Sequence, residues 1–191
     1  MTQAHSWASQ LETTLETVWR CLADAPLDRH ASMRFGTLAT SGPRGAEARL
    51  VVLRRTDRST ATCEVYTDVQ SAKVSELRAD PRATLLFWDP GIALQIRLRA
   101  SATIVAGDRA AEVFKGLPMP ARRDYGSGPP PGTPLGPEAA SSNDPDPGAV
   151  DRFCIIQFSV GEIETLHLGR DRHRRARFRP AVETQASQDQ A

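Results

Sequence analysis

Apolar side chains recur at three- and four-residue intervals near the start of the chain, as they do on one face of an amphipathic helix. They fall between residues 6 and 25, and Pro26 follows directly. Because proline cannot continue a helix, the pattern predicts a helix over residues 6–25. The apolar positions on its face are Trp7, Leu11, Leu15, Val18, Trp19 and Leu22.

From residue 33 the period of the pattern shortens toward two, which is typical of strands with one face in a core. Short helices are predicted over residues 71–80 and 108–115. Many short strands with few helices favour an antiparallel barrel over alternating strand–helix units, so we expect a mainly β fold with peripheral helices, of the α+β class. The predicted strands cover residues 33–41, 46–55, 61–67, 83–88, 93–106, 153–159 and 162–168.

Residues 118–150 differ in composition from the rest of the chain. They hold nine of its 14 prolines, and a segment of this kind does not sustain regular hydrogen-bonded structure. We therefore predict a Pro/Gly-rich loop insertion over residues 118–150, inside one domain that covers residues 1–180. Residues 181–191 are predicted to form a flexible polar tail.

The overall composition narrows the class of protein. The chain has 24 Lys and Arg against 23 Asp and Glu residues, which excludes a uniformly basic nucleic-acid binder. No apolar run approaches the roughly 20 residues of a membrane span, and the first residues do not resemble a signal peptide. The three cysteines form no CxxC pair, and no His/Cys cluster has metal-ligand spacing. We expect a cytoplasmic protein without a disulfide framework, a metal site or a membrane contact.

Two segments place cations where they suit an anionic ligand. Arg49 and Arg54 flank an apolar run of four residues, and residues 66–73 leave a strand and enter a helix whose first turn holds Ser71 and Lys73. A helix N-terminus offers backbone N–H groups to an anion, and the nearby cations add charge. These residues predict a phosphate site. From the residues alone an alternative stays open, in which Arg49 and Lys73 are solvated surface charges and Ser71 is only a helix cap.

Five motifs follow one another along the chain in a fixed order: Arg-x-Val-Val-Leu-Arg at 49–54, Tyr-Thr-Asp-x-x-Ser-x-Lys at 66–73, Asp80-Pro81-x-Ala83, Phe87-Trp88 and Gln95-Ile96-Arg97. This ordered series is similar to that of the pyridoxamine 5′-phosphate oxidase family, the FMN-binding split β-barrel flavoproteins. The likeness extends over about residues 34–114 and 153–178. It implies an antiparallel split β-barrel of the FMN-binding type.

The resemblance also implies roles for individual residues. Arg49 and Lys73 would hold the FMN phosphate with help from Thr67 and Ser71, and Gln95 would reach a polar edge of the flavin. It further implies a homodimer, with FMN at the subunit interface and residues drawn from both chains. The remaining residues assigned to the cofactor are Leu50, Val51, Val52 and Leu53, whose backbone would run along the isoalloxazine ring, together with Tyr66 and Arg175.

Residues 167–179 contain six arginines and one aspartate. One interpretation is a nucleic-acid-binding arm, although Phe178 is its only aromatic residue. The family instead ends in a related strand whose arginine and histidine face the flavin and the substrate. In that interpretation His173, Arg175 and Arg177 share one strand face because they are two residues apart. His173 and Arg177, with Arg54, are then candidate substrate contacts.

The pattern Leu-x-Leu-Gly-x-x-x-His-Arg-Arg at 166–175 resembles the Alr-type FMN-binding branch more than the authentic oxidase. Phe114 stands near the position where the oxidase grips its substrate phosphate with a tyrosine, which argues against pyridoxine phosphate as the substrate. The resemblance implies an FMN-dependent oxidase or reductase that passes a hydride from a small substrate to flavin N5, with oxygen or another acceptor reoxidising the flavin. The alternatives are a non-enzymatic flavin carrier or sensor, and a nucleic-acid binder acting through residues 170–179.

Overall fold

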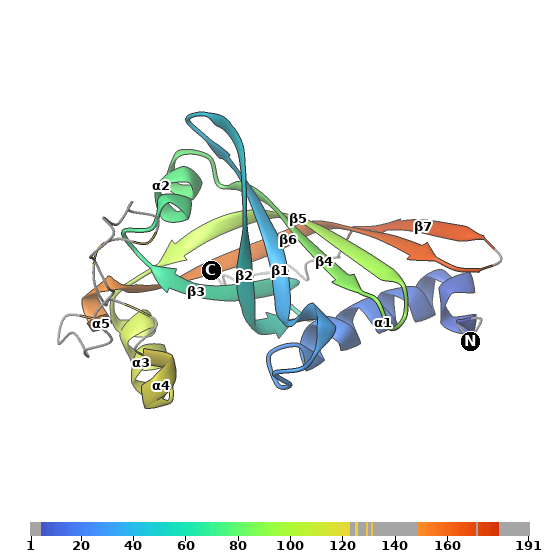
Figure 1. The fold of residues 1–191 in the computed structure, drawn as a ribbon, viewed down its shortest axis with the longest axis horizontal. Helices are drawn as coiled ribbons and strands as arrows, with labels where there is room; N and C mark the ends of the chain where they lie inside the picture. Colours follow the sequence, from blue (N-terminus) through green and yellow to red (C-terminus); the bar gives the residue numbers. More distant parts are fainter. Residues whose placement is uncertain are drawn as a thin grey trace, which may run out of the picture.

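Seven antiparallel strands form the body of the protein in a computed structural model, which describes residues 5–122, 125, 129, 131, 149–170 and 172–179. Their order is β3-β2-β1-β4-β5-β6-β7, and β3 also pairs with β6, so strands β1 to β6 close into a ring that β7 extends (Figure 1). This arrangement confirms the predicted fold class. The strands are β1 (Phe35–Gly42), β2 (Gly45–Asp57), β3 (Thr62–Asp68), β4 (Arg82–Asp89), β5 (Leu94–Val105), β6 (Phe153–Leu168) and β7 (His173–Phe178).

The interior of the ring is filled by every second side chain of its strands. In β5 the residues Leu94, Ile96 and Leu98 are fully buried, whereas Gln95 and Arg97 alternate with them on the outer face. This is the period of two that the sequence shows. A second, smaller cluster of buried apolar residues lies beside this core and consists of Ala110, Phe114, Tyr125, Ala149, Phe153 and Ile155.

The N-terminal helix is shorter than predicted. A 3-10 turn η1 (Ser6–Ser9) precedes helix α1 (Leu11–Asp24), and Gln10 between them is extended, with φ −126° and ψ 139°. The side-chain hydroxyls of Thr13 and Thr14 donate to the carbonyl of Trp7 at 2.7 and 3.1 Å, which secures the break. The prediction of one helix over residues 6–25 is therefore wrong at its start, because local side-chain hydrogen bonds compete with the helix there.

Strand β6 runs without interruption where the sequence predicts two strands. Arg99 pairs with Glu162 and Ala100 pairs with Val160, so Gly161 is the extra residue of a β-bulge. The bulge breaks the alternation of the sequence pattern without ending the strand. β6 thereby spans the sheet from α2 at one end of the molecule to β7 and α1 at the other (Figure 1).

Short helices cover the ends of the ring. α2 (Ala72–Ala79) connects β3 to β4, and α3 (Asp108–Gly116) follows β5. The predicted loop 118–150 contains the one-turn helix α4 (Met119–Arg122), and a second one-turn helix, α5 (Ala149–Arg152), begins within its last two residues, so its ends are not irregular. Most of that segment and the predicted tail 181–191 lie outside the described residues. Within the described part of the chain, no helix is long and apolar enough to cross a membrane.

Candidate functional site

Strand β2 presents its central residues alternately to the core and to the outside. Val51 and Leu53 are buried, whereas Leu50 is 71% exposed. The apolar run at residues 50–53 therefore forms a strand with one face in the core and the other face on the surface. Its outer side is an apolar surface that the fold of one chain leaves uncovered.

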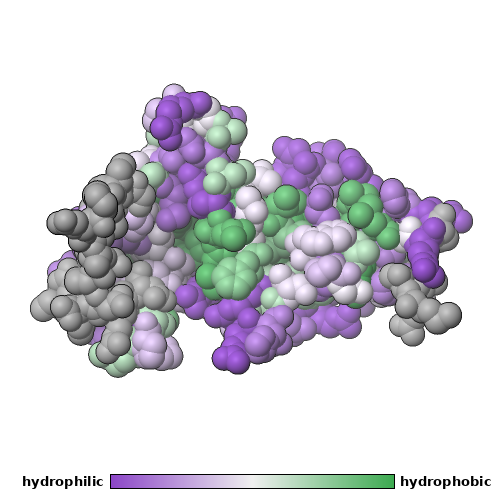
Figure 2. All heavy atoms as spheres, in the orientation of Figure 1, coloured by the Kyte–Doolittle hydropathy of each residue, from purple (hydrophilic) through white to green (hydrophobic). Residues whose placement is uncertain are grey.

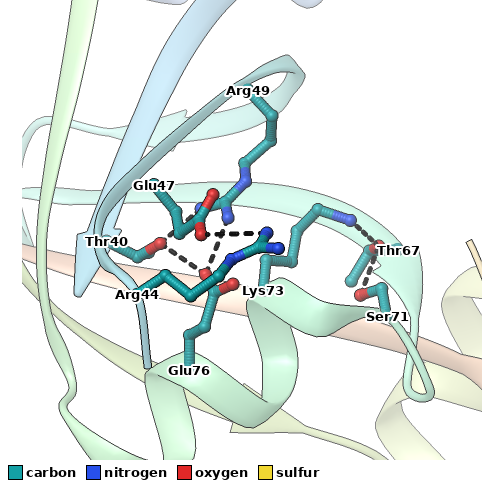
Figure 3. Close-up of polar contacts among 8 residues, drawn as sticks. All are labelled: Thr40, Arg44, Glu47, Arg49, Thr67, Ser71, Lys73 and Glu76. Carbon is teal, nitrogen blue, oxygen red and sulfur yellow. Dashed lines mark hydrogen bonds and ion pairs between the residues drawn. The ribbon is translucent and has the colours of Figure 1, made fainter. Parts of the chain in front are cut away.

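The start of α2 brings three predicted residues together. Lys73 Nζ donates to Thr67 Oγ1 at 2.9 Å, and Thr67 Oγ1 lies 3.3 Å from Ser71 Oγ (Figure 3). Ser71 precedes the first residue of the helix, but its side chain makes no capping hydrogen bond. Ser71 is thus the N-cap residue of α2 by position, as the alternative interpretation holds, but the cap does not use its side chain. Its hydroxyl and that of Thr67 are instead buried beside an ammonium group.

Lys73 is a half-buried cation without an acidic partner. No Asp or Glu within the described part of the chain forms an ion pair with it, although the charges of Asp68 and Glu76 act on its pKa, and its Nζ donates to the hydroxyl of Thr67. Burial lowers the pKa of Lys73, and the positive charge of Arg49 lowers it further. The fold of the chain alone therefore disfavours the charged form of Lys73. A cation of this kind is typical of a site in which a bound anion balances its charge.

Arg49 lies near Lys73 but is engaged differently. Its Nη2 forms an ion pair with Glu76 Oε2 at 2.7 Å, and its Nη1 donates to Thr40 Oγ1 (Figure 3). The Thr40 hydroxyl also donates to Glu76 at 2.5 Å, so the three side chains form one network between β1, β2 and α2. Neither Glu76 nor Thr40 is among the residues predicted from the sequence. Arg49 thus has a structural partner in addition to the cofactor role predicted for it.

A pocket of about 300 Å³ opens beside these residues, and half of the predicted site residues line it. Seven of its ten lining residues were predicted; Phe35, Val65 and Tyr125 were not. Its volume lies at the lower end of the roughly 300–1,000 Å³ typical of ligand pockets. Phe35 and Leu50 both line it and are largely exposed, so it opens onto the outer face of the sheet. The predicted lining residues are Leu50, Val51, Val52, Arg54, Tyr66, Thr67 and Lys73.

Arg54 and two tyrosines form one wall of this pocket. Arg54 Nη2 donates to Tyr125 Oη at 3.1 Å, and the Arg54 guanidinium lies 6.0 Å from the centre of the Tyr66 ring. Burial raises the pKa of Tyr66, which keeps its phenol neutral. The Nε of Arg54 is buried and has no hydrogen-bond partner among the described residues.

The remaining predicted residues lie elsewhere in the same chain. Gln95 is opposite Leu166, which is opposite Arg175, so these three side chains form one row across β5, β6 and β7. His173, Arg175 and Arg177 share the exposed face of β7, as their spacing predicts. β7 and α2 are at opposite ends of the molecule (Figure 1). One chain therefore does not bring Gln95, His173, Arg175 and Arg177 to the pocket.

The arginines of that second group lie in a ladder of charges on the outer face of β5, β6 and β7. Glu164 forms ion pairs with Arg97, with Arg175 at 3.6 Å and with Arg177 at 3.8 Å. The hydrogen bond from Arg97 and the neighbouring arginines hold the pKa of Glu164 below its ordinary value. Glu162 similarly pairs with Arg99 at 3.3 Å and with Arg177 at 3.6 Å.

A larger hollow of about 680 Å³ lies on the sheet away from the pocket. Its floor consists mainly of alanine, serine, threonine and glycine, and its arginines, Arg82 and Arg99, are paired with Asp80 and Glu162. It contains none of the predicted residues. The smaller pocket is the better candidate because it combines an apolar wall with cations that lack acidic partners.

No other part of the described chain offers an obvious reactive centre. No three His, Cys, Asp or Glu residues in the described ranges are grouped to hold a metal ion. Cys63 and Cys154 are buried, and burial raises their thiol pKa values to about 12 and about 11, so both are unreactive thiols. His5 Nδ1 lies 3.1 Å from His167 Nε2, and the Trp7 ring packs against both histidines.

Comparisons with known sequences relate the chain to one family of proteins. The family described as "Pyridoxamine 5′-phosphate oxidase, FMN-binding domain" matches residues 4–106. A pyridoxine/pyridoxamine 5′-phosphate oxidase from Granulibacter bethesdensis is 34% identical over 90 residues, which cover 45% of this chain and 42% of that protein. The chain therefore matches less than half the length of this curated relative.

Two solved structures share the fold over most of their length. A pyridoxamine 5′-phosphate oxidase-related, FMN-binding protein from Nostoc punctiforme superposes with a TM-score of 0.69 at 22% identity, covering 86% of this chain and 89% of that one. PhzG from Burkholderia lata 383, solved with tetrahydrophenazine-1-carboxylic acid, has a TM-score of 0.68 at 20% identity, with coverages of 94% and 93%. At these identities the likeness establishes the fold alone.

Proposed function

Because the chain belongs to the FMN-binding pyridoxamine 5′-phosphate oxidase family, we propose that it is an oxidoreductase that transfers a hydride between a small substrate and FMN. The cofactor is FMN, and the family includes oxidoreductases. The observation that carries the proposal is the half-buried ammonium of Lys73, which forms no ion pair with a described carboxylate and lies at the edge of an apolar pocket. A phosphate monoester attached to an apolar ring system matches those two features.

The residues present fit this cofactor. At the phosphate end, Lys73 supplies a charge, Thr67 and Ser71 supply hydroxyls, and the first turn of α2 supplies backbone N–H groups. Along β2, Leu50 and Val52 provide the apolar surface that a flavin ring requires. When bound, FMN supplies hydride-transfer chemistry that no side chain has. The chain contributes binding, orientation and the exclusion of water.

A homodimer would complete this site, and the outer face of the sheet supports one. Four large apolar side chains are exposed there, and Figure 2 shows the hydrophobic surface gathered near the middle of the molecule, over β1 and β2. Such a patch on a folded chain marks an interaction surface. Two of its members, Phe35 and Leu50, also line the pocket, so a partner that covers the patch closes the pocket. The four residues are Phe35, Leu50, Leu86 and Trp88.

Strand register connects this patch to the charge ladder. Leu86 is opposite Arg97, and Trp88 is opposite Gln95. The apolar patch and the ladder therefore belong to one continuous face. In a twofold dimer the same face covers itself, so the ladder of one copy can meet the pocket of the other. This would explain why Gln95 and Arg175 lie far from the pocket of their own chain.

The nucleic-acid alternative has less support. Arg175 and Arg177 form ion pairs with Glu162 and Glu164, and this reduces the positive charge that β7 offers to a phosphate backbone. Binding through residues 170–179 would also leave the half-buried Lys73 without a role, because Lys73 lies outside that segment. A flavin carrier or sensor would use the same pocket, and turnover distinguishes it from an oxidoreductase.

The test is to purify the protein, record its visible spectrum, and titrate flavin-free protein with FMN while following the quenching of flavin fluorescence. We expect a yellow protein, or a colourless one that takes up one FMN per chain. Photochemical reduction followed by exposure to air then reports whether the bound flavin returns its electrons to oxygen. A colourless protein that does not take up FMN would refute the proposal. FMN binding without turnover of any donor would support the carrier or sensor.

A further inference from the structure

The turn of residues 69–71, between β3 and α2, is held by an ion pair of two residues outside the predicted site. Asp68 ends β3 and is 3% exposed, and its Oδ2 accepts a hydrogen bond from Arg152 Nη2. Arg152 is the last residue of α5 and directly precedes β6. Asp68 is also the acidic residue of the Tyr-Thr-Asp motif at residues 66–68, to which no role has been assigned.

The same two residues accept hydrogen bonds from three successive N–H groups of the turn. Val69 N donates to the Arg152 carbonyl at 2.7 Å. Gln70 N donates to Asp68 Oδ1 at 2.7 Å, and Ser71 N donates to the Asp68 carbonyl at 3.1 Å. Backbone N–H groups in a folded chain need such partners. The conformation of the whole turn therefore depends on this pair.

The turn connects the groups that would hold the FMN phosphate. Ser71 is its last residue and the N-cap of α2, and Thr67, one residue before Asp68, accepts the hydrogen bond of Lys73. A shift of the turn would move the Ser71 hydroxyl and the start of α2 away from the Thr67 hydroxyl. Binding groups must be held to within roughly 0.5 Å of their productive geometry, so the turn has to be fixed before the phosphate arrives.

Arg152 also balances a negative charge close to the phosphate end of the pocket. Burial lowers the pKa of Lys73, and the charge of Asp68 acts on it in the opposite direction. An Asp68 carboxylate without its arginine would therefore compete with the phosphate for Lys73 and would repel the phosphate directly. The ion pair with Arg152 reduces both effects.

We propose that Asp68 and Arg152 are positioning residues for the FMN phosphate, because their ion pair fixes the turn of residues 69–71 and holds the Asp68 charge away from Lys73. The inference rests on the proposed function, since the phosphate is that of the proposed cofactor. Neither residue has to touch FMN, because both act through the turn. Since Arg152 ends α5, the pair also joins the end of the Pro/Gly-rich segment to the phosphate end of the pocket.

A second ion pair on β3 provides a matched control. Arg109 on α3 pairs with Glu64, and Glu64 is 3% exposed, as is Asp68. Glu64 lies four residues before Asp68, or roughly 13 Å along an extended strand, and so away from the turn. Loss of either pair should lower the stability of the fold, but only loss of the Asp68–Arg152 pair should disturb the turn.

The experiment compares Asp68→Asn, Arg152→Met, their double variant and Arg109→Met. It measures the urea midpoint and the amide hydrogen exchange of residues 69–71 without flavin, and FMN affinity by fluorescence quenching. Asp68→Asn keeps an oxygen for Gln70 N but turns an N–H₂ group toward Arg152. Each single change should speed exchange in the turn and weaken FMN binding about 10-fold. The double variant should be no weaker than either, because both residues act through one contact.

Two further variants separate positioning from stability. Arg109→Met should lower the urea midpoint while FMN affinity and exchange in the turn stay as in wild type. Arg152→Lys, which keeps a positive charge, should weaken FMN binding less than Arg152→Met. If Arg152→Met does not fold, Asp68→Asn and Arg152→Lys carry the same comparison.

The outcomes distinguish this inference from the proposed function. If wild type does not take up FMN, the proposed function fails, and unchanged exchange in Asp68→Asn would separately refute the role of the pair in the turn. If wild type binds FMN and Asp68→Asn binds it equally or more tightly, the inference is wrong, because the carboxylate would then only repel the phosphate. It is also wrong if Arg109→Met weakens FMN binding as much as Arg152→Met, or if the losses in the double variant multiply.

Discussion

Two groups of cations lie at opposite ends of the molecule, and they differ in whether an acidic side chain accompanies them. At the end of the molecule near α2, Lys73 is half-buried, donates to the Thr67 hydroxyl and forms no ion pair with a described Asp or Glu. On β5, β6 and β7 the arginines are more exposed, and Glu162 and Glu164 pair with them. The group with fewer charges is the stronger candidate for an anion site, because a half-buried cation without an ion-pair partner gains more from a bound anion than an arginine already paired with a carboxylate.

Arg49 stands between these two cases. It lies near the uncompensated Lys73, yet Glu76 and Thr40 bind its guanidinium. Arginine content by itself therefore does not locate the site. The site is located by which cations have an acidic partner and which do not. This difference gives each of the following substitutions a different expected result.

The largest effect is expected for Lys73→Met. The change removes the cation at the phosphate end that forms no ion pair with any described carboxylate, so FMN affinity should fall about 100-fold, equivalent to about 2.7 kcal/mol. The free energy of unfolding without FMN should not fall, because burial already disfavours this charge. Fluorescence titration and urea denaturation measure the two quantities.

Lys115→Met is the matched control for Lys73→Met. Lys115 is the other lysine of the chain, and it is exposed on α3. Its removal should change neither FMN affinity nor stability. If Lys73→Met bound FMN as tightly as Lys115→Met, the assignment of the phosphate site would be wrong.

Glu76→Gln should have effects opposite to those of Lys73→Met: it should lower the stability of the fold without weakening FMN binding. It leaves Arg49 without its acidic partner, so the free energy of unfolding should fall by about 2–3 kcal/mol. This is less than the 3–5 kcal/mol of a fully buried pair, because the Arg49 side chain is 23% exposed. FMN affinity should hold or rise, because the freed guanidinium adds positive charge near the phosphate.

Urea denaturation without FMN and fluorescence titration of the same sample test this prediction, with the exposed Glu112→Gln on α3 as the control. A loss of FMN affinity larger than the loss of stability would instead mean that Glu76 positions Arg49 for the phosphate.

Arg175→Ala tests whether the charge ladder serves the pocket of a second copy. In a homodimer with a shared site, FMN affinity should fall about 10-fold, although β7, which carries Arg175, and α2 lie at opposite ends of the molecule (Figure 1). Arg99→Ala, on the same ladder, is the control. Mixing Lys73→Met chains with Arg175→Ala chains should restore wild-type affinity at some sites, because a mixed dimer contains one intact site. No restoration, or a monomer by light scattering, would contradict the shared site.

Much of the fold follows from local patterns, and family likeness adds the cofactor. The alternation in β5 and the helix after residue 71 were predicted because one strand face or one helix start determines them. The break at Gln10 and the bulge at Gly161 were missed, because side-chain hydrogen bonds and pairing with β5 create them. The motif series correctly indicated the family and FMN.

The candidate site was predicted less completely, because the partners of its charged side chains are distant in the sequence. Glu76 compensates Arg49 from 27 positions away, and Tyr125 reaches Arg54 from 71 positions away out of a proline-rich segment. Neither contact follows from a regular spacing of residues, so neither could be predicted from the sequence pattern. The roles of Gln95 and Arg175 stay predictions, because they involve a second copy of the chain.

The smallest effect is expected for Glu164→Gln, and its pH dependence distinguishes the ladder from the pocket. Glu164 binds arginines that are one-third to two-thirds exposed, so its loss should cost only about 1 kcal/mol at pH 7. Its pKa is lowered from 4.5 in the fold, so its contribution is present above that value and disappears as the pH falls through the lower folded pKa. Wild type and variant should therefore differ in urea midpoint at pH 7 and converge in strong acid. A difference that persists at pH 2 would show that Glu164 acts through packing rather than charge, and the ladder would then no longer be a compensated counterpart of Lys73.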